Sequence, residues 1–465
     1  MMKKAWQLER ELRDSAIPID RRKHASHWYE SDFSAPSGDD LIRLFWNSSV
    51  PGSLAPEIPY QEMVQAWSNQ GYDVSEAEKL IPIGIALRAS DQMEALRVLT
   101  VKLLNHLRTA SKIPNHPYNG YAQYSSWDEI VHALPSASQS FPPVLWLDSF
   151  NEKIYWGWLG QLAGGSFGTA IEGYTGTQIA KVYGEVRSYI TPPETKNDDV
   201  LYELVFLDVF ERMGSNITSE EIGVEWIRQI PFGWSAEWVA LRNLSMGIFP
   251  PESGKFLNFY SDWIGAQMRG MICGMLAPAN PLEAIRLSYI DGVVSHASNG
   301  VCGEMFAGAL TALAFTACDS RKLIQDALNF IPSGSEYAEK AAFVIKTLSE
   351  NKNPDKAWSL LEKHFERYNW IHSYPNMAAD LFSLWYCNDD FTEAMALLAK
   401  AGNDVDCNAG LVGNILGVMK GVPPVWADPI GDLLETYIKG KERLSIKELA
   451  ARTARLAKSY QIIQQ

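Results

Sequence analysis

From Ser149 onward, apolar residues recur at helical spacing in one segment after another, and this periodicity constrains the fold more than any other feature of the chain. Ser149 is suited to cap the first helix, and Asn197 stands before Val200 and Leu204, which share a helical face. The alternation typical of strands is scarce, with residues 182–190 as the best candidate. We therefore expect an all-α domain without a fixed-period repeat. The further segments compatible with helices are 263–276, 282–290, 303–317, 321–330, 336–349, 355–367, 376–387, 391–400, 409–419, 430–438 and 446–459.

The first part of the chain has a different texture, in which irregular stretches rich in Pro, Ser and aromatic residues flank a helical region. The irregular stretches include 34–59 and 114–127, and the helical region spans 75–108. Residues 135–143 have the composition of a linker. We therefore expect two units, an N-terminal extension of helices and loops in residues 1–145 and a compact multi-helix domain in residues 146–465.

The overall charge limits the classes of partner that the protein can bind. The formal net charge is −14 at neutral pH, and no basic stripe suited to phosphates is present, so we expect no nucleic-acid partner. No segment is apolar for long enough to span a bilayer, and residues 1–13 lack the apolar core of a cleavable signal, so we expect no membrane partner. The five cysteines, an odd number mostly within apolar segments, predict reduced thiols in a cytoplasmic protein.

Two acidic clusters, Asn-Asp-Asp at 197–199 and Asp-Val-Asp-Cys-Asn at 404–408, each stand directly before an apolar segment that predicts a buried helix. Taken alone, each is most simply an N-cap. A third segment, 164–172, is a Gly-rich turn that ends in the carboxylate of Glu172. Carboxylates grouped at the ends of buried helices are costly to keep charged without a cation between them, and oxygen ligands suit Mg²⁺. Together the segments predict an oxygen-rich metal site and hydrolytic chemistry.

Small residues in the helix predicted after the second acidic cluster indicate close packing. Gly410, Gly413 and Gly417 do not favour a helix, because glycine lowers helix propensity. They allow a neighbouring backbone or a ligand to approach. For Gly413 and Gly417 we expect helix packing.

The motifs resemble those of the ADP-ribosylglycohydrolase family, which includes the glycohydrolase that reactivates dinitrogenase reductase. They follow the family's order over residues 150–460. The corresponding segments are 153–172 for the opening helix with its terminal Glu, 197–199 for Thr-Asp-Asp, 263–269 for the Gly-Ala-x-Met-Arg helix, 295–306 for the Thr-His segment that lines the cleft, and 402–408 for Gly-x-Asp-Thr-Asp-Thr. Gly165, Asn197, Val200 and Cys407 depart from the family pattern, which indicates a divergent subgroup.

This resemblance implies two Mg²⁺ ions, with Mn²⁺ as the alternative metal, held between the motifs. The implied metal ligands are Asn197, Asp198, Asp199, Asp404, Asp406 and Cys407. A thiol suits a hard cation poorly, and Asn408 could supply an oxygen instead. The implied catalytic residues are Glu172, Asp198 and Asp199, and the implied substrate contacts are Glu172, Gly168, His296, Ser298, Asn299 and Asn408.

The function that the resemblance implies is the Mg²⁺-dependent cleavage of a ribosyl glycosidic bond, with removal of ADP-ribose from a modified substrate. One alternative is a small-molecule hydrolase that acts on N-ribosyl bonds of nucleoside type, closed by the extension as a lid. The aromatic loop with Tyr118, Tyr121, Tyr124 and Trp127 could stack on a base or sugar, although packing on the helical core explains it more simply. A second alternative is a non-enzymatic binding relative with the same fold.

Overall fold

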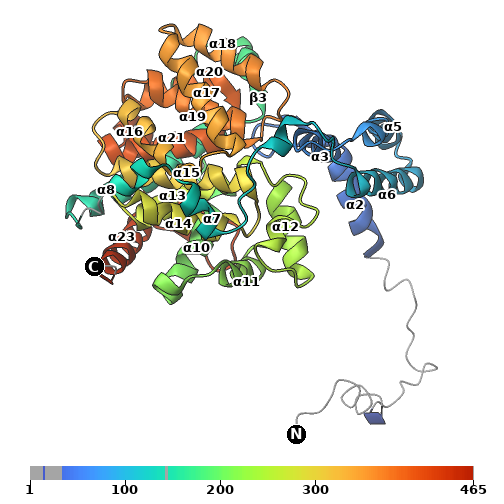
Figure 1. Ribbon diagram of the computed structural model, residues 1–465, viewed down its shortest axis with the longest axis horizontal. Helices are drawn as coiled ribbons and strands as arrows, with labels where there is room; N and C mark the ends of the chain where they lie inside the picture. Colours follow the sequence, from blue (N-terminus) through green and yellow to red (C-terminus); the bar gives the residue numbers. More distant parts are fainter. Residues whose placement is uncertain (1–13, 16–33, 142–144, 464–465) are drawn as a thin grey trace.

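Helices form nearly all of the regular structure, and the expected all-α fold is confirmed. The computed structural model describes residues 14–15, 34–141 and 145–463, so the expectation about a signal in residues 1–13 lies outside the described residues. A body of helices from residue 149 onward lies beside a smaller N-terminal lobe (Figure 1). The strands in the described residues are two residues long and form three antiparallel pairs: β1 (Ser48–Ser49) with β2 (Pro56–Glu57), β3 (Tyr174–Thr175) with β4 (Gly402–Asn403), and β5 (Leu434–Glu435) with β6 (Arg443–Leu444).

The N-terminal lobe contains a helix that the sequence did not predict. Its helices are α2 (Ser34–Trp46), α3 (Pro59–Asn69), α4 (Ser75–Glu78), α5 (Ile81–Ala89) and α6 (Met93–Thr109). The helical prediction for 75–108 is confirmed, whereas the irregular structure expected for 34–59 is wrong over α2. Tertiary contacts stabilise this helix: Trp46 is fully buried and donates its Nε1–H to Thr100 Oγ1 at 2.8 Å, and Phe45 packs on Trp238 with ring centroids 4.7 Å apart.

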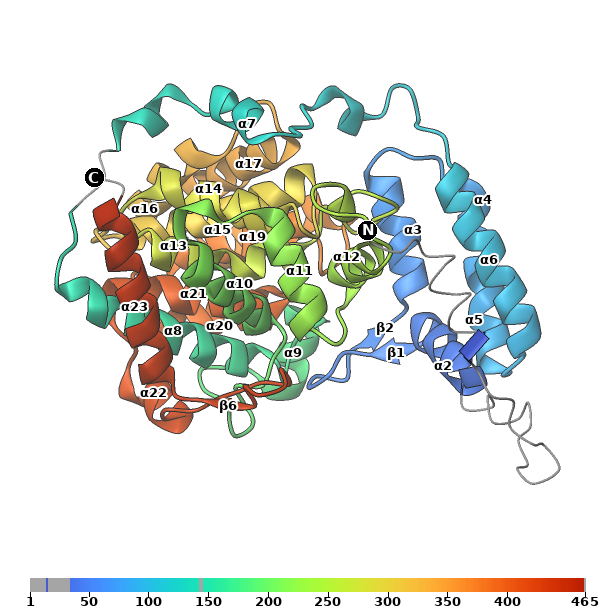
Figure 2. The same cartoon turned by 90° about the horizontal axis from the view of Figure 1, so that it is seen from below.

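Residues 110–141 form a strap that runs along the body between the lobe and the first body helix (Figure 2). Its short elements are η2 (Pro117–Gly120), α7 (Trp127–Ala133) and η3 (Ser136–Ser140). Tyr118 is buried and donates its hydroxyl to Asp262 Oδ2 at 2.8 Å, and Trp127 packs on Tyr289 with ring centroids 5.8 Å apart. The aromatic loop therefore packs on the helical core, as the simpler alternative expects. Residues 142 and 143 of the expected linker lie outside the described residues.

The body follows the predicted succession of helices closely. Its main helices are α8 (Ser149–Gly168), α9 (Gly176–Tyr183), α10 (Asp199–Met213), α11 (Ser219–Gln229), α12 (Ser235–Ser245), α13 (Gly270–Leu276), α14 (Pro281–Gly292), α15 (Ser298–Ala314), α16 (Ser320–Ala327), α17 (Glu336–Glu350), α18 (Pro354–Phe365), α19 (Ser373–Tyr386), α20 (Phe391–Ala401), α21 (Val405–Lys420), α22 (Pro424–Ile430) and α23 (Ile446–Ile463). The 3₁₀ segments η4 (Gly214–Asn216), η5 (Glu252–Gly254), η6 (Ile264–Arg269) and η7 (Leu328–Phe330) connect them. Among the described residues, no helix has both the length and the apolar character needed to cross a bilayer.

Two local predictions in the body are wrong for reasons of backbone geometry. The helix predicted at 430–438 does not form, because Gly431 at φ +65° ends α22 and the chain continues into β5. The strand candidate at 182–190 does not form either. A capping box between Thr175 and Gln178 starts α9, which takes up residues 182 and 183 and ends at Gly184 with φ +71°.

The centre of the body is a contact between α8 and α21 in which the two backbones touch. A Cβ atom added to Gly160 would lie 2.1 Å from Gly413 O, and one added to Gly413 would lie 2.2 Å from Gly160 O. The same holds one turn away, where a Cβ atom added to Gly164 would lie 1.8 Å from Ala409 O. Helix packing is therefore confirmed as the role of Gly413. It is also confirmed for Gly417, where an added Cβ atom would collide with the backbone oxygen of Trp156.

This packing predicts opposite effects for two alanine substitutions in α21. Gly413→Ala should lower the free energy of unfolding by about 1–3 kcal/mol, because the new methyl group forces the backbones apart. A Cβ atom added to Gly410, on the same helix, would have its nearest neighbour at 3.8 Å. Gly410→Ala should therefore be neutral or should stabilise the protein by up to about 1 kcal/mol through helix propensity. Urea unfolding of both variants measures the difference. Equal effects would contradict the close contact.

Candidate functional site

The structure brings the three predicted acidic segments together at one end of the α8–α21 contact. Glu172 lies in the loop after α8, Asp198 and Asp199 lie at the start of α10, and Asp404 and Asp406 lie at the start of α21. Two hydrogen bonds join segments about two hundred residues apart. Asn197 Nδ2 donates to Asp406 Oδ2 at 3.0 Å, and the Cys407 thiol donates to Asp199 Oδ1 at 3.3 Å.

Asn197 serves both helices at once. Its Oδ1 accepts the backbone N–H of Asp199 at 2.6 Å, which caps the start of α10, while its Nδ2 donates to Asp406 in the other cluster. An amide can accept and donate in this way through two different atoms. The amide oxygen predicted as a metal ligand is therefore engaged in the cap in this structure.

Asn376 is a site residue that sequence reasoning missed. From α19, its Oδ1 accepts the backbone N–H of Asp404 at 3.2 Å and the Nδ2–H of Asn408 at 2.8 Å. Its own Nδ2 donates to the carbonyl oxygens of Trp370 and His372 at 2.7 and 2.9 Å. The available signal was an asparagine at the start of the mostly apolar segment predicted as a helix at 376–387, which is compatible with a buried polar contact.

The five carboxylates lie close together, and the hydrogen bonds around them neutralise no charge. Their negative charges therefore repel one another. Burial and the charge of Asp406 raise the pKa of Asp198 to about 6, and burial followed by the neighbouring carboxylates raises the pKa values of Glu172, Asp199 and Asp404 well above their usual range. Among the described residues, none of the ion pairs formed by Lys or Arg includes any of the five. Asp198 as a whole residue is exposed although protein atoms desolvate its carboxyl group, and Glu172 is half-buried, so the cluster opens to solvent on their side.

The chemistry of this cluster fits a hard divalent cation. Asp404 Oδ1 and Asn408 Oδ1 are buried without a hydrogen-bond partner, which leaves two oxygen atoms available as ligands. Ligand atoms of Asp404, Asp406 and Cys407 lie within 4.8 Å of one another. Burial, with the charges of Asp199 and Asp404, raises the pKa of the Cys407 thiol well above its usual range, so it stays a hydrogen-bond donor to Asp199. The carboxylate and amide oxygens therefore fit Mg²⁺ better than the sulfur does.

The family model of ADP-ribosylglycohydrolase matches residues 147–461 of this chain. The chain belongs to the ADP-ribosylglycohydrolase family. It is similar to an uncharacterized protein of Archaeoglobus fulgidus, with 23% identity over 299 residues that cover 59% of this chain and 90% of the relative. A solved structure described as an ADP-ribosylglycohydrolase-related protein complex aligns with 67% of this chain and 100% of its own, at a TM-score of 0.49 and 18% identity. Membership of this family supports a glycohydrolase-type function.

Two of the three residues expected to contact substrate through the Thr-His segment, His296 and Asn299, are buried in the protein. His296 is fully buried, its Nδ1 lies 2.7 Å from Ser295 Oγ, and burial lowers its pKa well below the usual range. Asn299 is buried and its Oδ1 accepts the backbone N–H of Tyr337 at 3.1 Å, while Ser298 is half-buried at the start of α15. No hydrogen bond among the described residues links these three to the acidic segments.

Gly168 is placed at the cluster by packing. A Cβ atom there would lie 2.2 Å from the backbone nitrogen of Asp406, so the end of α8 touches the start of α21. Asn408 is fully buried and shares Asn376 with Asp404. Both residues therefore shape the cluster from within the protein.

Glu237 and Tyr437 border the cluster and were not predicted. Glu237, on α12, is buried and accepts from Arg269 Nη1 at 2.9 Å. Burial raises the pKa of Glu237 to about 7. The charge of Arg269 lowers this pKa, and the charge of Asp198 adds to the rise. The Tyr437 ring stacks on the exposed Phe232 with centroids 5.0 Å apart, and after burial the charge of Asp198 raises its pKa. Single residues of these types carry no spacing pattern that would identify them.

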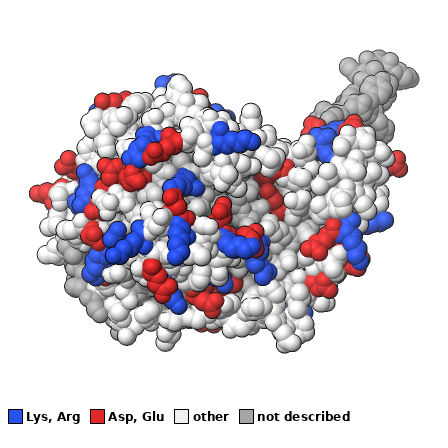
Figure 3. All heavy atoms as spheres, turned by 90° about the horizontal axis from the view of Figure 1, so that it is seen from above, with Lys and Arg blue, Asp and Glu red and all other residues white. Residues whose placement is uncertain are grey.

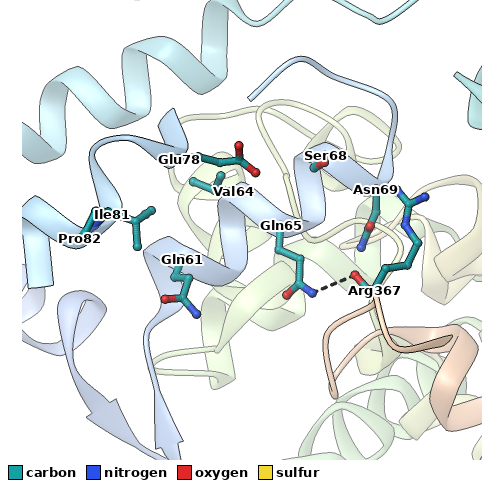
Figure 4. Close-up of a pocket in the computed structure, with 9 residues that line it drawn as sticks. All are labelled: Gln61, Val64, Gln65, Ser68, Asn69, Glu78, Ile81, Pro82 and Arg367. Carbon is teal, nitrogen blue, oxygen red and sulfur yellow. Dashed lines mark hydrogen bonds between the residues drawn. The ribbon is translucent and has the colours of Figure 1, made fainter. Parts of the chain in front are cut away.

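A groove of about 650 Å³ where the lobe meets the body is separate from the acidic cluster (Figure 4). Residues of α3 line it together with Glu78, Ile81 and Pro82, and Arg367 of the body lies beside α3, where its backbone oxygen accepts from Gln65 Nε2 at 2.9 Å. None of the predicted site residues lines this groove. On the face of the molecule shown in Figure 3, acidic and basic side chains are interspersed without a basic stripe.

The cluster predicts opposite effects of charge removal with and without metal. In chelator, Asp404→Asn should raise the free energy of unfolding by about 1 kcal/mol or more, because one repelling charge is lost. Mg²⁺ at about a hundredfold above its dissociation constant should stabilise the wild type by about 2.7 kcal/mol and the variant far less. Differential scanning calorimetry with and without Mg²⁺ measures both effects.

Asp208→Asn provides the matched control for this measurement. Asp208 lies on the same helix as Asp199 but accepts from Gln229 Nε2 at 2.8 Å and from Arg452 Nη2 at 2.9 Å, and Lys441 also pairs with it. Its neutralisation should destabilise the protein and leave the Mg²⁺ effect intact. A wild type that is indifferent to millimolar Mg²⁺ would rule out the metal site.

Proposed function

We propose that this protein is a Mg²⁺-dependent glycohydrolase that cleaves a ribosyl glycosidic bond and removes ADP-ribose from a modified substrate. The observation that carries the proposal is the meeting of Glu172 with the aspartates of both clusters, without a neutralising Lys or Arg among the described residues. A protein gains nothing in stability from burying like charges together, so their grouping supports a functional role. Membership of the ADP-ribosylglycohydrolase family supports the class of reaction.

In this proposal Asp198, Asp199, Asp404 and Asp406 would hold the metal. Bound Mg²⁺ would orient the hydroxyl groups of the ribose and lower the pKa of a coordinated water. Asn197 and Asn376 keep the two acidic segments in place through the hydrogen bonds described above. The exposed side of the cluster, at Asp198, is where a sugar would enter.

Glu172 has the role of the acid or base. It is half-buried on a loop at the edge of the cluster, so its carboxyl group can reach both a substrate atom and a water. As a base it would take a proton from the attacking water, and as an acid it would give one to the leaving group. The neighbouring negative charges would stabilise the positive charge that develops on the sugar ring during cleavage.

The first alternative is a hydrolase of small N-ribosyl compounds of the nucleoside type. The observation in its favour is that the β1–β2 hairpin of the N-terminal lobe packs directly against the loop that carries Glu172. A lobe in contact with this loop is placed as a lid over a small substrate would be. The non-enzymatic alternative is disfavoured by the retention of all five carboxylates in one cluster.

A substrate panel distinguishes these functions. With Mg²⁺ present, we expect release of ADP-ribose from ADP-ribosyl-arginine or ADP-ribosyl-serine peptides, followed by liquid chromatography and mass spectrometry. Free nucleosides in parallel reactions test the alternative, and addition of chelator provides the metal-free control. Release from nucleosides alone would overturn the leading form of the proposal, and no release from any substrate would favour the binding relative.

Glu172→Gln should separate catalysis from binding. The amide keeps the size of the side chain but cannot exchange a proton, so kcat should fall by roughly a hundredfold or more while KM changes little. Glu225→Gln is the control, because Glu225 is a buried carboxylate on α11 that pairs with Arg212 of α10. Steady-state kinetics at saturating Mg²⁺ measures both variants. A Glu172→Gln enzyme with full kcat would exclude the assigned role.

A further inference from the structure

The β1–β2 hairpin is the part of the N-terminal lobe that reaches the body next to the α8–α9 loop (Figure 2). Its tip, residues 50–55, is a closed turn in which Val50 N donates to Ala55 O and Leu54 N donates to Val50 O, both at 2.9 Å. Gly52 at φ +93° and Leu54 at φ +62° make this sharp turn possible. The hairpin tip lies outside residues 147–461, which the family model matches.

The hairpin tip contacts the Glu172 loop at three points. A Cβ atom added to Gly52 would lie 2.4 Å from Thr169 Cγ2, so the turn rests directly on the last turn of α8. A Cβ atom added to Gly173, the residue after Glu172, would lie 2.7 Å from Ala55 Cβ. Beyond it, the Tyr174 hydroxyl donates to Ser53 O at 3.2 Å.

The opposite side of the Glu172 loop is bonded to the segment that leads into Asp404. Gly173 N donates to Asn403 O at 2.8 Å, and β3 pairs with β4 immediately beyond. The loop is therefore held between the hairpin of the lobe and the second acidic segment of the body. Its own regular structure is only the two residues of β3, which is too little to hold a conformation independently.

The base of the hairpin is anchored to the body on a second element. Glu57 is 3% exposed, its Oε1 accepts Trp234 Nε1–H at 2.7 Å and its Oε2 accepts the Ser48 hydroxyl at 3.0 Å. Trp234 directly precedes α12, the helix that carries Glu237 beside the cluster. The hairpin thus spans two elements that border the site, and these contacts fix its place relative to both.

The contacts on its two sides therefore order the Glu172 loop, because the two residues of β3 do not hold it by themselves. We propose that the hairpin is a positioning element of the site, which holds the Glu172 loop in place and makes the N-terminal lobe part of the machinery for turnover. This inference rests on the proposed function of Glu172.

Two variants of the full-length protein loosen this contact without removing the hairpin. Tyr174→Phe deletes the hydroxyl that donates to Ser53, and Gly52→Ala places a methyl group against Thr169. Tyr386→Phe is the matched control, because the Tyr386 hydroxyl also donates to a distant backbone oxygen, Leu348 O at 3.2 Å, away from the acidic segments.

Hydrogen exchange followed by mass spectrometry tests the contact independently of activity. Exchange of the amides in residues 169–175 should accelerate by roughly fivefold in Tyr174→Phe and Gly52→Ala and stay unchanged in the control. Adding Thr169→Ser to Gly52→Ala removes the opposing methyl group and should partly restore protection. Unchanged exchange in both single variants would overturn the inference.

Kinetics on the best substrate of the panel tests the consequence for turnover. We expect kcat to fall roughly tenfold to a hundredfold in the two variants, with KM and the Mg²⁺-induced stabilisation retained, because only the placement of Glu172 changes. Accelerated exchange with unchanged kcat would overturn the positioning role and leave the proposed function standing. A wild type inactive on the whole panel would instead remove the proposed function, and hydrogen exchange would then decide on the hairpin contact alone.

Discussion

The contact between α8 and α21 is the interaction on which the rest of the structure depends. The two helices approach until backbone touches backbone, and only glycine permits this at Gly160, Gly164 and Gly413. The same approach continues to Gly168, where the end of α8 meets the start of α21. The close packing of these glycines therefore places Glu172 next to the 404–408 cluster, a few turns away.

Packing alone would make this end of the molecule unfavourable, because it groups five carboxylates without a cation. Asn197, Asn376 and the Cys407 thiol supply hydrogen bonds that orient the groups but neutralise no charge. The two unpartnered oxygens, Asp404 Oδ1 and Asn408 Oδ1, show that the protein's own hydrogen bonds do not satisfy the cluster. A bound divalent cation would resolve both deficits, which is why the metal and the glycohydrolase proposals depend on each other.

The N-terminal residues outside the family match are integrated into the body at several places. Tyr118 of the strap bonds to Asp262 beneath the surface, and the hairpin tip rests on the Glu172 loop. Both contacts join residues far apart in sequence, so no local pattern predicts them. The helix α2 illustrates the same limit: its Pro- and Ser-rich sequence indicates a loop, and burial of Trp46 stabilises a helix.

Sequence alone determined the helical class, most helix positions and the three acidic segments, because helical periodicity and caps are local properties of the chain. It also identified the family, because the motifs keep their order and spacing. Only the tertiary structure decided that the Asn197 amide oxygen caps α10, that Asn376 joins the cluster, and that His296 is buried in the core. These outcomes depend on which atoms meet across hundreds of residues, and that is settled by three-dimensional packing and the pairing of buried polar groups.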